Sequence, residues 1–324
     1  MVKLIDPSVE LYKLRCIKDI TKHIEKCGRI CYKSENNITE DSADKFIAGI
    51  LKSGHESVIE HANLIFRIKK SAHNNNLLLK IGYLVKGINI TDESDKAYIL
   101  SGNMRAFRDI FRLTGISNFN DYFKFNDNLN IFYIDIKPTE YFTDEIELID
   151  IQDNLYFNTL YPINHCYITA HFVCDLGVYK DITRHRLASF SIESTRYCNY
   201  SKDKFGNELN IIKPINIKEG TEEYKIWLDC MNNIENSYMQ MASLPNIKAD
   251  QLRMMLPHSV KADVIMTANA LEWKHIFNLR CAKQAHPSVR QIMLNLLNLM
   301  YKEYPSLFSR EYKLFKDDIK EFKF

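Results

Sequence analysis

The sequence predicts a fold that mixes α-helices with β-strands, because two different hydrophobic patterns occur along it. Residues 61–70 and 166–174 have the alternation or the composition of strands, whereas the segment after Pro287 repeats apolar side chains at helical spacing. Only 10 glycines and 8 prolines interrupt the 324 residues, so the elements should be long and no extended linker is expected. This length allows about two domains or one large one.

The first half of the chain is expected to begin with helix and to continue with strands and a further helix. The expected elements are mostly helix from Ser8 to about Lys52, a strand at 61–70, a hairpin at 87–103 with its turn at 92–95, and a helix at 103–113. From about residue 115 to 160 the sequence is rich in aromatic residues and asparagine and fits no regular pattern. We interpret that stretch as part of an insertion.

The second half is expected to hold one strand and several helices. The expected elements are a strand at 166–174, a helix capped by Asp175, helices at 221–243 and about 259–282, and a last clear helix from about Ser288. The last helix carries an apolar stripe made by Val289, Ile292, Met293, Leu296 and Met300. Such a stripe is typical of a protein core or a subunit interface.

Charge and hydropathy exclude several classes of protein. The 43 Lys and Arg residues nearly balance the 41 Asp and Glu residues, which argues against a protein that coats duplex DNA or an anionic membrane. The longest stretch without these charged residues, 154–174, contains too many polar groups to cross a bilayer. The N-terminus lacks an apolar run of signal-peptide length, so a cytoplasmic protein without a membrane partner is expected.

Cysteine and histidine spacing point to neither disulfides nor a metal. The eight cysteines form no CxxC pair, so free thiols are expected, and none of them stands out as a nucleophile. His55 and His61 could be mistaken for metal ligands, but no third ligand lies at a usual spacing. We therefore expect no metal site.

Chemistry-bearing residues are densest between residues 180 and 201. If the helix after Asp175 continues, Asp181, Arg184 and His185 share one face near its C-terminal end. Small hydroxyl residues and another arginine, Arg196, follow them. Guanidinium and hydroxyl groups can donate to phosphate oxygens together, so this segment suits a phosphate. A solvated basic turn with an ion pair is the alternative, and residue types alone do not decide between the two.

These residues also resemble a known family. Arg184-His185-Arg186, followed after seven residues by Ser194 and then by Thr195-Arg196-Tyr197, resembles the signature of the flavin-dependent thymidylate synthases. Three further segments are similar to other motifs of that family and follow in the same order. The first is GHESVIEH at 54–61 and the second is RMMLP at 253–257. The third is NALEWKHIFNLR at 269–280 together with AHPSVR at 285–290.

The resemblance implies an α+β fold, a twisted antiparallel sheet flanked by helices, built as a single domain over residues 1–324 with an insertion at about 70–165. It implies a homotetramer whose active sites are shared between subunits. It also implies the reductive methylation of deoxyuridylate (dUMP) to thymidylate (dTMP). Methylenetetrahydrofolate would give the carbon and FAD reduced by NADPH the hydride, without a protein nucleophile.

The resemblance also implies roles for individual residues. Arg280, facing the uracil ring, and Ser194 would be catalytic. The residues implied for dUMP are Asp181, Arg184, Glu193, Ser194, Thr195, Arg196, Arg280 and, from a neighbouring subunit, Arg253. Those implied for FAD are Ser57, Arg184, His185, Arg186, Leu187, Ile192, Asn269 and His275, with His55 and Glu60 bordering the flavin and folate space.

Two other functions stay open on the residues alone. A protein that binds single-stranded nucleic acid could use Arg184, Arg186 and Arg196 beside the rings of Phe190, Tyr197 and Tyr200. A metal-dependent nucleotide hydrolase could use His55, Glu60 and His61. The near-neutral charge weighs against nucleic acid as a partner, and the incomplete ligand set weighs against the hydrolase.

Overall fold

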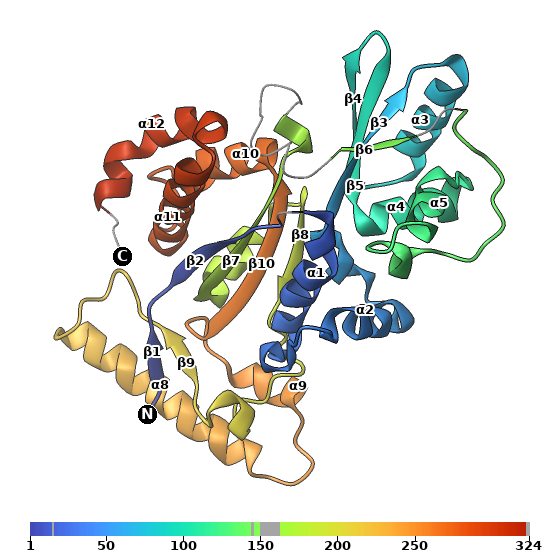
Figure 1. Cartoon of the computed structure of the whole chain (residues 1–324). Coiled ribbons are helices and arrows are strands. Elements are labelled where there is room, and N and C mark those ends of the chain that lie inside the picture. Colours follow the sequence, from blue (N-terminus) through green and yellow to red (C-terminus); the bar gives the residue numbers. More distant parts are fainter. Residues whose placement is uncertain (15, 144–145, 150–162, 322–324) are drawn as a thin grey trace.

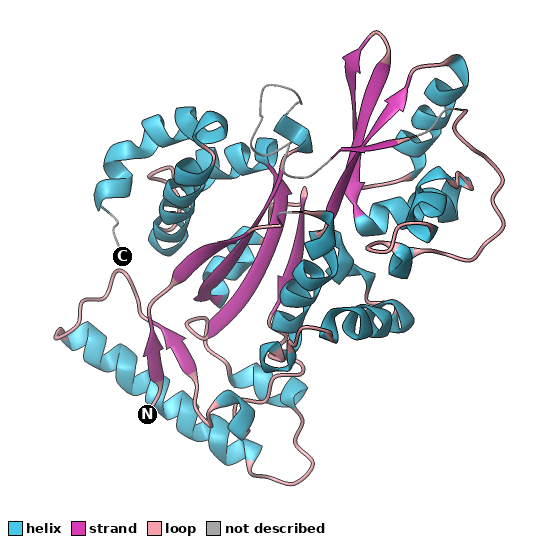
Figure 2. Cartoon of the chain, in the orientation of Figure 1, coloured by secondary structure: helices cyan, strands magenta, loops and turns pink. Residues whose placement is uncertain are grey.

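The computed structural model describes residues 1–14, 16–143, 146–149 and 163–321. Its centre is a twisted antiparallel sheet of four strands (Figure 1). In spatial order the strands are β2 (Ser8–Tyr12), β7 (Tyr167–Asp175), β10 (Lys261–Asn269) and β8 (Ala188–Ile192). Helices flank this sheet, as Figure 2 shows, so the α+β fold expected from the sequence is confirmed.

The central sheet has one apolar and one polar face. On β10, Val264, Met266 and Ala268 belong to a core that helices cover, whereas Asp263 and Thr267 bond polar side chains on the other face. Alternation of this kind follows from the two-residue period of a strand. The helices that contribute to the apolar core are α7 (Leu176–Ile182), α10 (Ala270–Arg280), α11 (Pro287–Glu303) and α12 (Pro305–Glu321).

Two helices and a 3₁₀ segment lie beside the polar face. They are α1 (Ile20–Arg29), α2 (Ser42–Ser53) and η4 (Glu56–His61), and η4 coincides with the GHESVIEH motif. From η4, His61 reaches both β10 and β8, because its ring nitrogens lie 2.8 Å from Thr267 Oγ1 and 2.9 Å from Ser191 Oγ. The motif is therefore fixed directly to the central sheet.

A second antiparallel sheet is built around β3 (Asn63–Lys69). Its strand order is β4 (Ile88–Ser94), β5 (Ala97–Asn103), β3 and β6 (Glu147–Ile149), and its helices are α3 (Ala72–Leu84), α4 (Met104–Thr114) and α5 (Asn118–Lys124). Phe66, Phe107 and Phe119 pack edge to face in its core. Most of this unit comes from the stretch interpreted as an insertion. The organisation as one domain stays a prediction.

A smaller unit lies around the N-terminus, as Figure 1 shows. It consists of the parallel pair β1 (Lys3–Ile5) and β9 (Asn210–Ile212), with α8 (Glu222–Ala242) and α9 (Ala249–Leu252). The remaining 3₁₀ segments are η1 (Ile17–Asp19), η2 (Ile30–Tyr32), η3 (Glu35–Asn37), η5 (Asn130–Phe132), η6 (Ile163–His165), η7 (Asp203–Phe205) and η8 (Arg253–Met255).

Two stretches that were expected to be helical are strands. Residues 8–12 form strand β2, and residues 261–269 form β10 rather than the first half of a helix. Strand β10 pairs with β7 on one side and β8 on the other, and nearly all of its residues are buried. The short apolar run Val264–Met266 at its centre has no clear two-residue alternation, and a run this short is not separated from a buried helix by local periodicity.

Most other element predictions are confirmed. The structure contains the strands at 63–69 and 167–175, the hairpin of β4 and β5, and the helices α4, α8 and α11. The Asp175 carboxylate caps α7 by accepting a hydrogen bond of 2.8 Å from the Val178 backbone N–H. The apolar stripe of α11 is buried within the chain, so the core alternative holds for that helix. Helix α12, by contrast, was not predicted.

All eight cysteines are free thiols, as expected. In the part of the chain that the structure describes, no helix is both long enough and apolar enough to span a bilayer.

Candidate functional site

The segment Arg184-His185-Arg186 forms the loop that joins α7 to β8. The predicted continuation of the helix through Arg184 and His185 is wrong, because α7 ends at Ile182 and the chain must turn to enter β8 at Ala188. The two arginine side chains are exposed, whereas His185 is buried between them. The loop therefore offers two cations to a ligand and directs one imidazole inward.

Arg280, the last residue of α10, connects this loop to Asp181. Its Nε–H donates to Nε2 of His185 at 2.9 Å, and its Nη2 donates to the Asp181 backbone carbonyl at 2.9 Å. Its Nη1 also lies 3.6 Å from the Asp181 carboxylate. Arg280 is thus brought to two residues that are 95 and 99 positions away in sequence, and its guanidinium is held in one orientation.

His185 is neutral in this arrangement. Burial, with the nearby Arg280 and His275, lowers the pKa of His185 to about 4. Since Nε2 accepts a hydrogen bond from Arg280, the proton must reside on Nδ1. Nδ1 lies 3.7 Å from Oε1 of Glu272, whose pKa is raised by burial. The imidazole is therefore positioned from both sides.

His185, Glu272 and His275 form the one group of three or more metal-ligand side chains that converges among the described residues. Their ligand atoms lie within 4.8 Å of one another. Metal binding at Nδ1 of His185 would require that nitrogen to lose its proton, whereas the hydrogen bond from Arg280 keeps the proton there. The geometry favours a positioned imidazole over a metal ligand.

The residues that follow β8 differ sharply in exposure. The Glu193 carboxylate is buried, receives hydrogen bonds of 2.8 Å from Lys261 and from Tyr200, and is 3.5 Å from Lys33. Because these partners occupy the side chain, only main-chain atoms of Glu193 remain for a ligand. Ser194 and Thr195 are partly exposed and Arg196 is exposed.

Four of the predicted residues line a large cleft between the two sheets. They are Glu60, Arg186, Leu187 and Asn269. The cleft has a volume of about 800 Å³, and its other wall is formed by insertion residues of β4 and α4 and the segment before β4. Glu60 is held in place by Ser189 at 3.2 Å and by Arg105 of α4 at 2.8 Å. Volumes of several hundred Å³ are typical of cofactor sites.

The remaining predicted residues lie apart from this cleft within the single chain. His55 bonds the Tyr32 hydroxyl at 3.2 Å and lines a separate surface recess. Ser57 and Arg253 are exposed, on η4 and η8. Ile192 is partly buried and packs against the apolar core. His275 is exposed, and its ring centroid lies 6.2 Å from that of His185.

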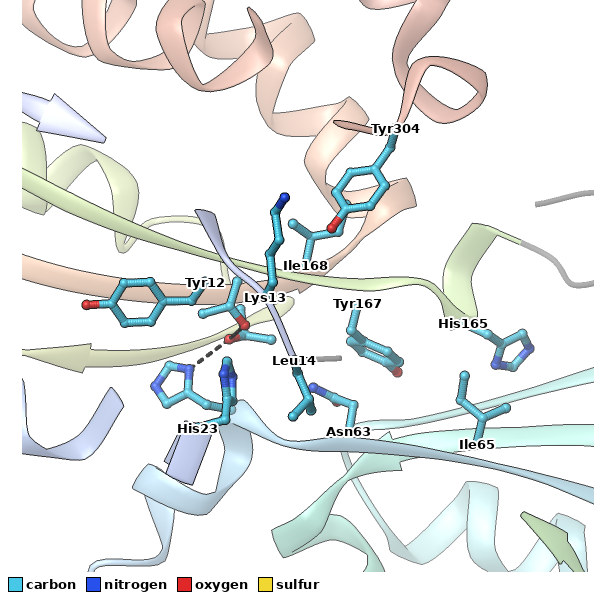
Figure 3. A pocket seen from close by; sticks show the side chains of 13 residues that line it. Tyr12, Lys13, Leu14, His23, Asn63, Ile65, His165, Tyr167, Ile168 and Tyr304 are labelled. Atoms are coloured by element: carbon cyan, nitrogen blue, oxygen red, sulfur yellow. Dashed lines mark hydrogen bonds between the residues drawn. The ribbon is translucent and has the colours of Figure 1, made fainter. Parts of the chain in front are cut away.

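A small cavity lies where the end of β2, α1 and β3 meet β7 (Figure 3). Its volume of about 30 Å³ has room for about two water molecules and is far too small for a cofactor. Asn63 lines both this cavity and the large cleft. The Asn63 residue is only 8% exposed, and no described residue makes a hydrogen bond with its carboxamide.

Glu272 and Asn63 are two of the polar residues at the site that the sequence motifs did not single out. Glu272 lies three residues before His275 on one face of α10, so helical spacing could have indicated it. Asn63 lies two residues after the GHESVIEH segment, but nothing in a single sequence reveals that it lines the cleft.

A family model described as "Thymidylate synthase complementing protein" matches residues 14–73 and 151–306, which together make up more than half of the chain. The curated relatives include a flavin-dependent thymidylate synthase of Geobacter sulfurreducens, 27% identical over 127 residues, or 39% of this chain and 53% of the relative. A protein of the same name from Pyrococcus furiosus is 30% identical over 129 residues, or 40% of this chain and 52% of the relative. The chain thus spans about half the length of these relatives.

Among solved structures, the crystal structure of thymidylate synthase X from Helicobacter pylori with FAD and dUMP is 20% identical to this chain. The match covers 50% of this chain and 81% of that chain, with a TM-score of 0.38.

Proposed function

The chain belongs to the family of thymidylate synthase complementing proteins, and from this premise we propose that it is a flavin-dependent thymidylate synthase. It would methylate dUMP to dTMP, with methylenetetrahydrofolate as carbon donor. When bound, FAD that has been reduced by NADPH supplies the hydride. Support comes from the names of the curated relatives and from the arrangement around Arg280.

The observation that carries this proposal is the fixed guanidinium of Arg280. A cation that is already oriented costs no reorganisation when negative charge develops on a bound pyrimidine ring. Hydrogen bonds to His185 and to the Asp181 carbonyl fix Arg280. The Arg280 side chain is 20% exposed, so part of the guanidinium stays accessible. In this proposal Arg280 faces the uracil ring. The protein accelerates the reaction by positioning the reactants and needs no nucleophile of its own.

The nucleotide phosphate would be bound by the exposed cations and hydroxyls near this loop. Arg184 and Arg196 are exposed, and Ser194 and Thr195 are accessible beside them in sequence, a donor set that fits a phosphate. Arg253 is exposed on η8 and has no ion-pair partner among the described residues, which suits its proposed role in a neighbouring subunit's site. A homotetramer with shared sites is part of the proposal.

The large cleft fits FAD by size and by chemistry. It holds about 800 Å³, and it is lined by Arg186, Asn269 and Asn63. We propose that these residues, with Leu187 and Glu60 at the border, hold the flavin dinucleotide. His185, Ile192, His275, Ser57 and His55 would complete the flavin and folate surroundings when subunits associate. A cytoplasmic location is proposed with this activity.

Binding of single-stranded nucleic acid has less support. Of the three rings that such a protein would use, Tyr200 is buried and Phe190 packs against the core, which leaves Tyr197 exposed. Stacking of successive bases needs several exposed rings.

The proposal is tested first by the absorption spectrum of the purified protein and then by turnover. Oxidised flavin absorbs near about 375 and 450 nm. With NADPH and methylenetetrahydrofolate present, the protein should release tritium from 5-tritiated dUMP. We expect Arg280→Ala to slow that release at least about tenfold, or roughly 1.4 kcal/mol in the barrier.

Two variants serve as comparisons. Arg310→Ala removes an exposed arginine of α12, far from these motifs in sequence, and should leave tritium release unchanged. Ser194→Ala should weaken dUMP binding while FAD is retained. A colourless protein that does not bind added FAD would contradict the proposed function, and unchanged turnover in Arg280→Ala would remove that residue from its role.

A further inference from the structure

The insertion forms one wall of the large cleft. Residues 84–89 run from the last residue of α3 through a short connection into the start of β4. The other lining residues of the insertion, at the end of β5 and in α4, are Asn103, Arg105, Ala106, Asp109 and Leu113. The opposite wall carries Glu60, Asn269 and residues 186–189. One wall of the cleft therefore comes from the part of the chain that matches the family model, and the other comes from the part that does not.

The two walls are held together by arginines of α4. Arg105 bonds Glu60 at 2.8 Å, and Arg108 and Arg112 bond Glu56 at 3.3 and 2.6 Å. In addition, the Met104 backbone N–H donates to the Ala62 carbonyl at 2.8 Å. Since Glu56 and Glu60 both belong to η4, the insertion is fixed directly onto that motif, and its wall is positioned to contact a ligand.

Two cations that line the cleft have no acidic partner. Arg105 neutralises Glu60, and Asp109 is 3.0 Å from Arg112. This leaves Lys86 from the insertion and Arg186 from the opposite wall, for which the described residues provide no ion pair. Their positive charges are thus available to an anionic group.

The Asn63 carboxamide is a second polar group at the cleft. It lines both the cleft and the small cavity beside it, so solvent reaches it in the free protein and a bound ligand would replace that solvent. Asn63 is 8% exposed and lines the cleft. A polar group of a bound ligand could both donate to this amide and accept from it.

We propose that the insertion provides a subsite for the anionic tail of the cofactor or co-substrate, bound by Lys86 together with Arg186 and anchored by Asn63. This rests on the proposed function, from which the ligand classes follow. The tail is either the diphosphate of the flavin dinucleotide or the glutamate carboxylates of the folate. Both are anions on an elongated molecule that carries an aromatic ring.

Lys86→Ala is the direct test, with Lys137→Ala as its control. Lys137 is also an exposed lysine of the insertion, but it does not line the cleft. Dissociation constants would be measured on the full chain for FAD, for inorganic diphosphate, and for folate with one and with four glutamates. We expect Lys86→Ala to weaken one class at least about tenfold and Lys137→Ala to change each constant less than about twofold.

The pattern of losses identifies the tail. Weaker FAD and diphosphate binding assigns the subsite to the dinucleotide, whereas a loss confined to tetraglutamyl folate assigns it to the folate. If all constants survive Lys86→Ala, the subsite proposal is wrong whether or not the enzyme turns over. If the wild-type chain binds diphosphate through Lys86 but neither binds FAD nor releases tritium, the proposed function fails and the subsite stands.

Asn63→Leu gives an independent check. Leucine keeps the branching of the side chain but can neither donate nor accept a hydrogen bond, so affinity for the ligand should fall at least about fivefold. The melting temperature of the ligand-free protein is measured beside it. A lower melting temperature with unchanged affinity would show that the amide serves the fold and would remove Asn63 from the subsite.

Discussion

At the scale of single residues, His185 shows how the site is organised. The imidazole lies between a guanidinium, which donates to its Nε2, and a buried carboxylate near its Nδ1. This environment fixes one neutral tautomer and keeps Arg280 in place. The motif in the sequence identified His185 and Arg280, but only the structure shows that they contact each other.

Replacing Arg280 should raise the pKa of His185. In Arg280→Gln the imidazolium form no longer faces a neighbouring cation, so the pKa should move from about 4 towards 6.5, while burial continues to hold it below that value. Histidine-selective NMR during a pH titration measures the change. Arg184→Gln is the control, because this exposed neighbour in sequence is not among the groups that shift the pKa of His185. A pKa that moves equally in both variants would contradict the assigned contact.

At the scale of elements, close packing of α1 against its neighbours positions the η4 motif. Gly28 of α1 lies so close to Val58 and Phe46 that a β-carbon at residue 28 would be 2.4 Å from the Val58 side chain and 2.8 Å from the Phe46 ring. The absence of a side chain at this position therefore allows α1, α2 and η4 to meet.

Alanine at two helical glycines should have opposite effects. Gly28→Ala should lower the free energy of unfolding by about 1–3 kcal/mol, because overpacking forces the contacting side chains apart. Gly49→Ala, in α2, places its methyl group in open space and should stabilise the protein by about 0.5–1 kcal/mol, since alanine favours the helix. Urea titration of the two variants measures both changes, and equal stabilisation by both would refute the close approach at residue 28.

At the scale of the whole molecule, buried histidines connect the units. His61 bonds two strands of the central sheet, and His165 lies 2.5 Å from Thr91 Oγ1 and 2.6 Å from Ser101 Oγ in the second sheet. Burial lowers the pKa of His61 to about 3 and the pKa values of His23 and His165 to about 4. The hydrogen bonds that these histidines make depend on neutral imidazole rings.

The protein should therefore lose stability in mild acid. Below about pH 6.5 the unfolded chain binds protons that the folded chain does not, so the stabilisation is present above that pH and is lost as the pH falls towards 4. For the fully buried His23 and His61 we expect a loss of about 2 kcal/mol each between pH 7.5 and 5. Urea titrations at the two pH values measure it. His23→Leu should reduce the pH dependence, and equal stability of the wild type at both values would contradict the prediction.

The sequence by itself determined many of the local elements, and it predicted the residues that we propose for the chemistry. A cap such as Asp175 and a proline at the start of α11 act within one turn, so they can be read locally. The tertiary structure decided that residues 261–269 form a central strand, because pairing with β7 and β8 overrides local pattern. It also decided that His185 contacts Arg280 and that the insertion forms one wall of the cleft, since contacts between distant segments follow from packing of the whole chain.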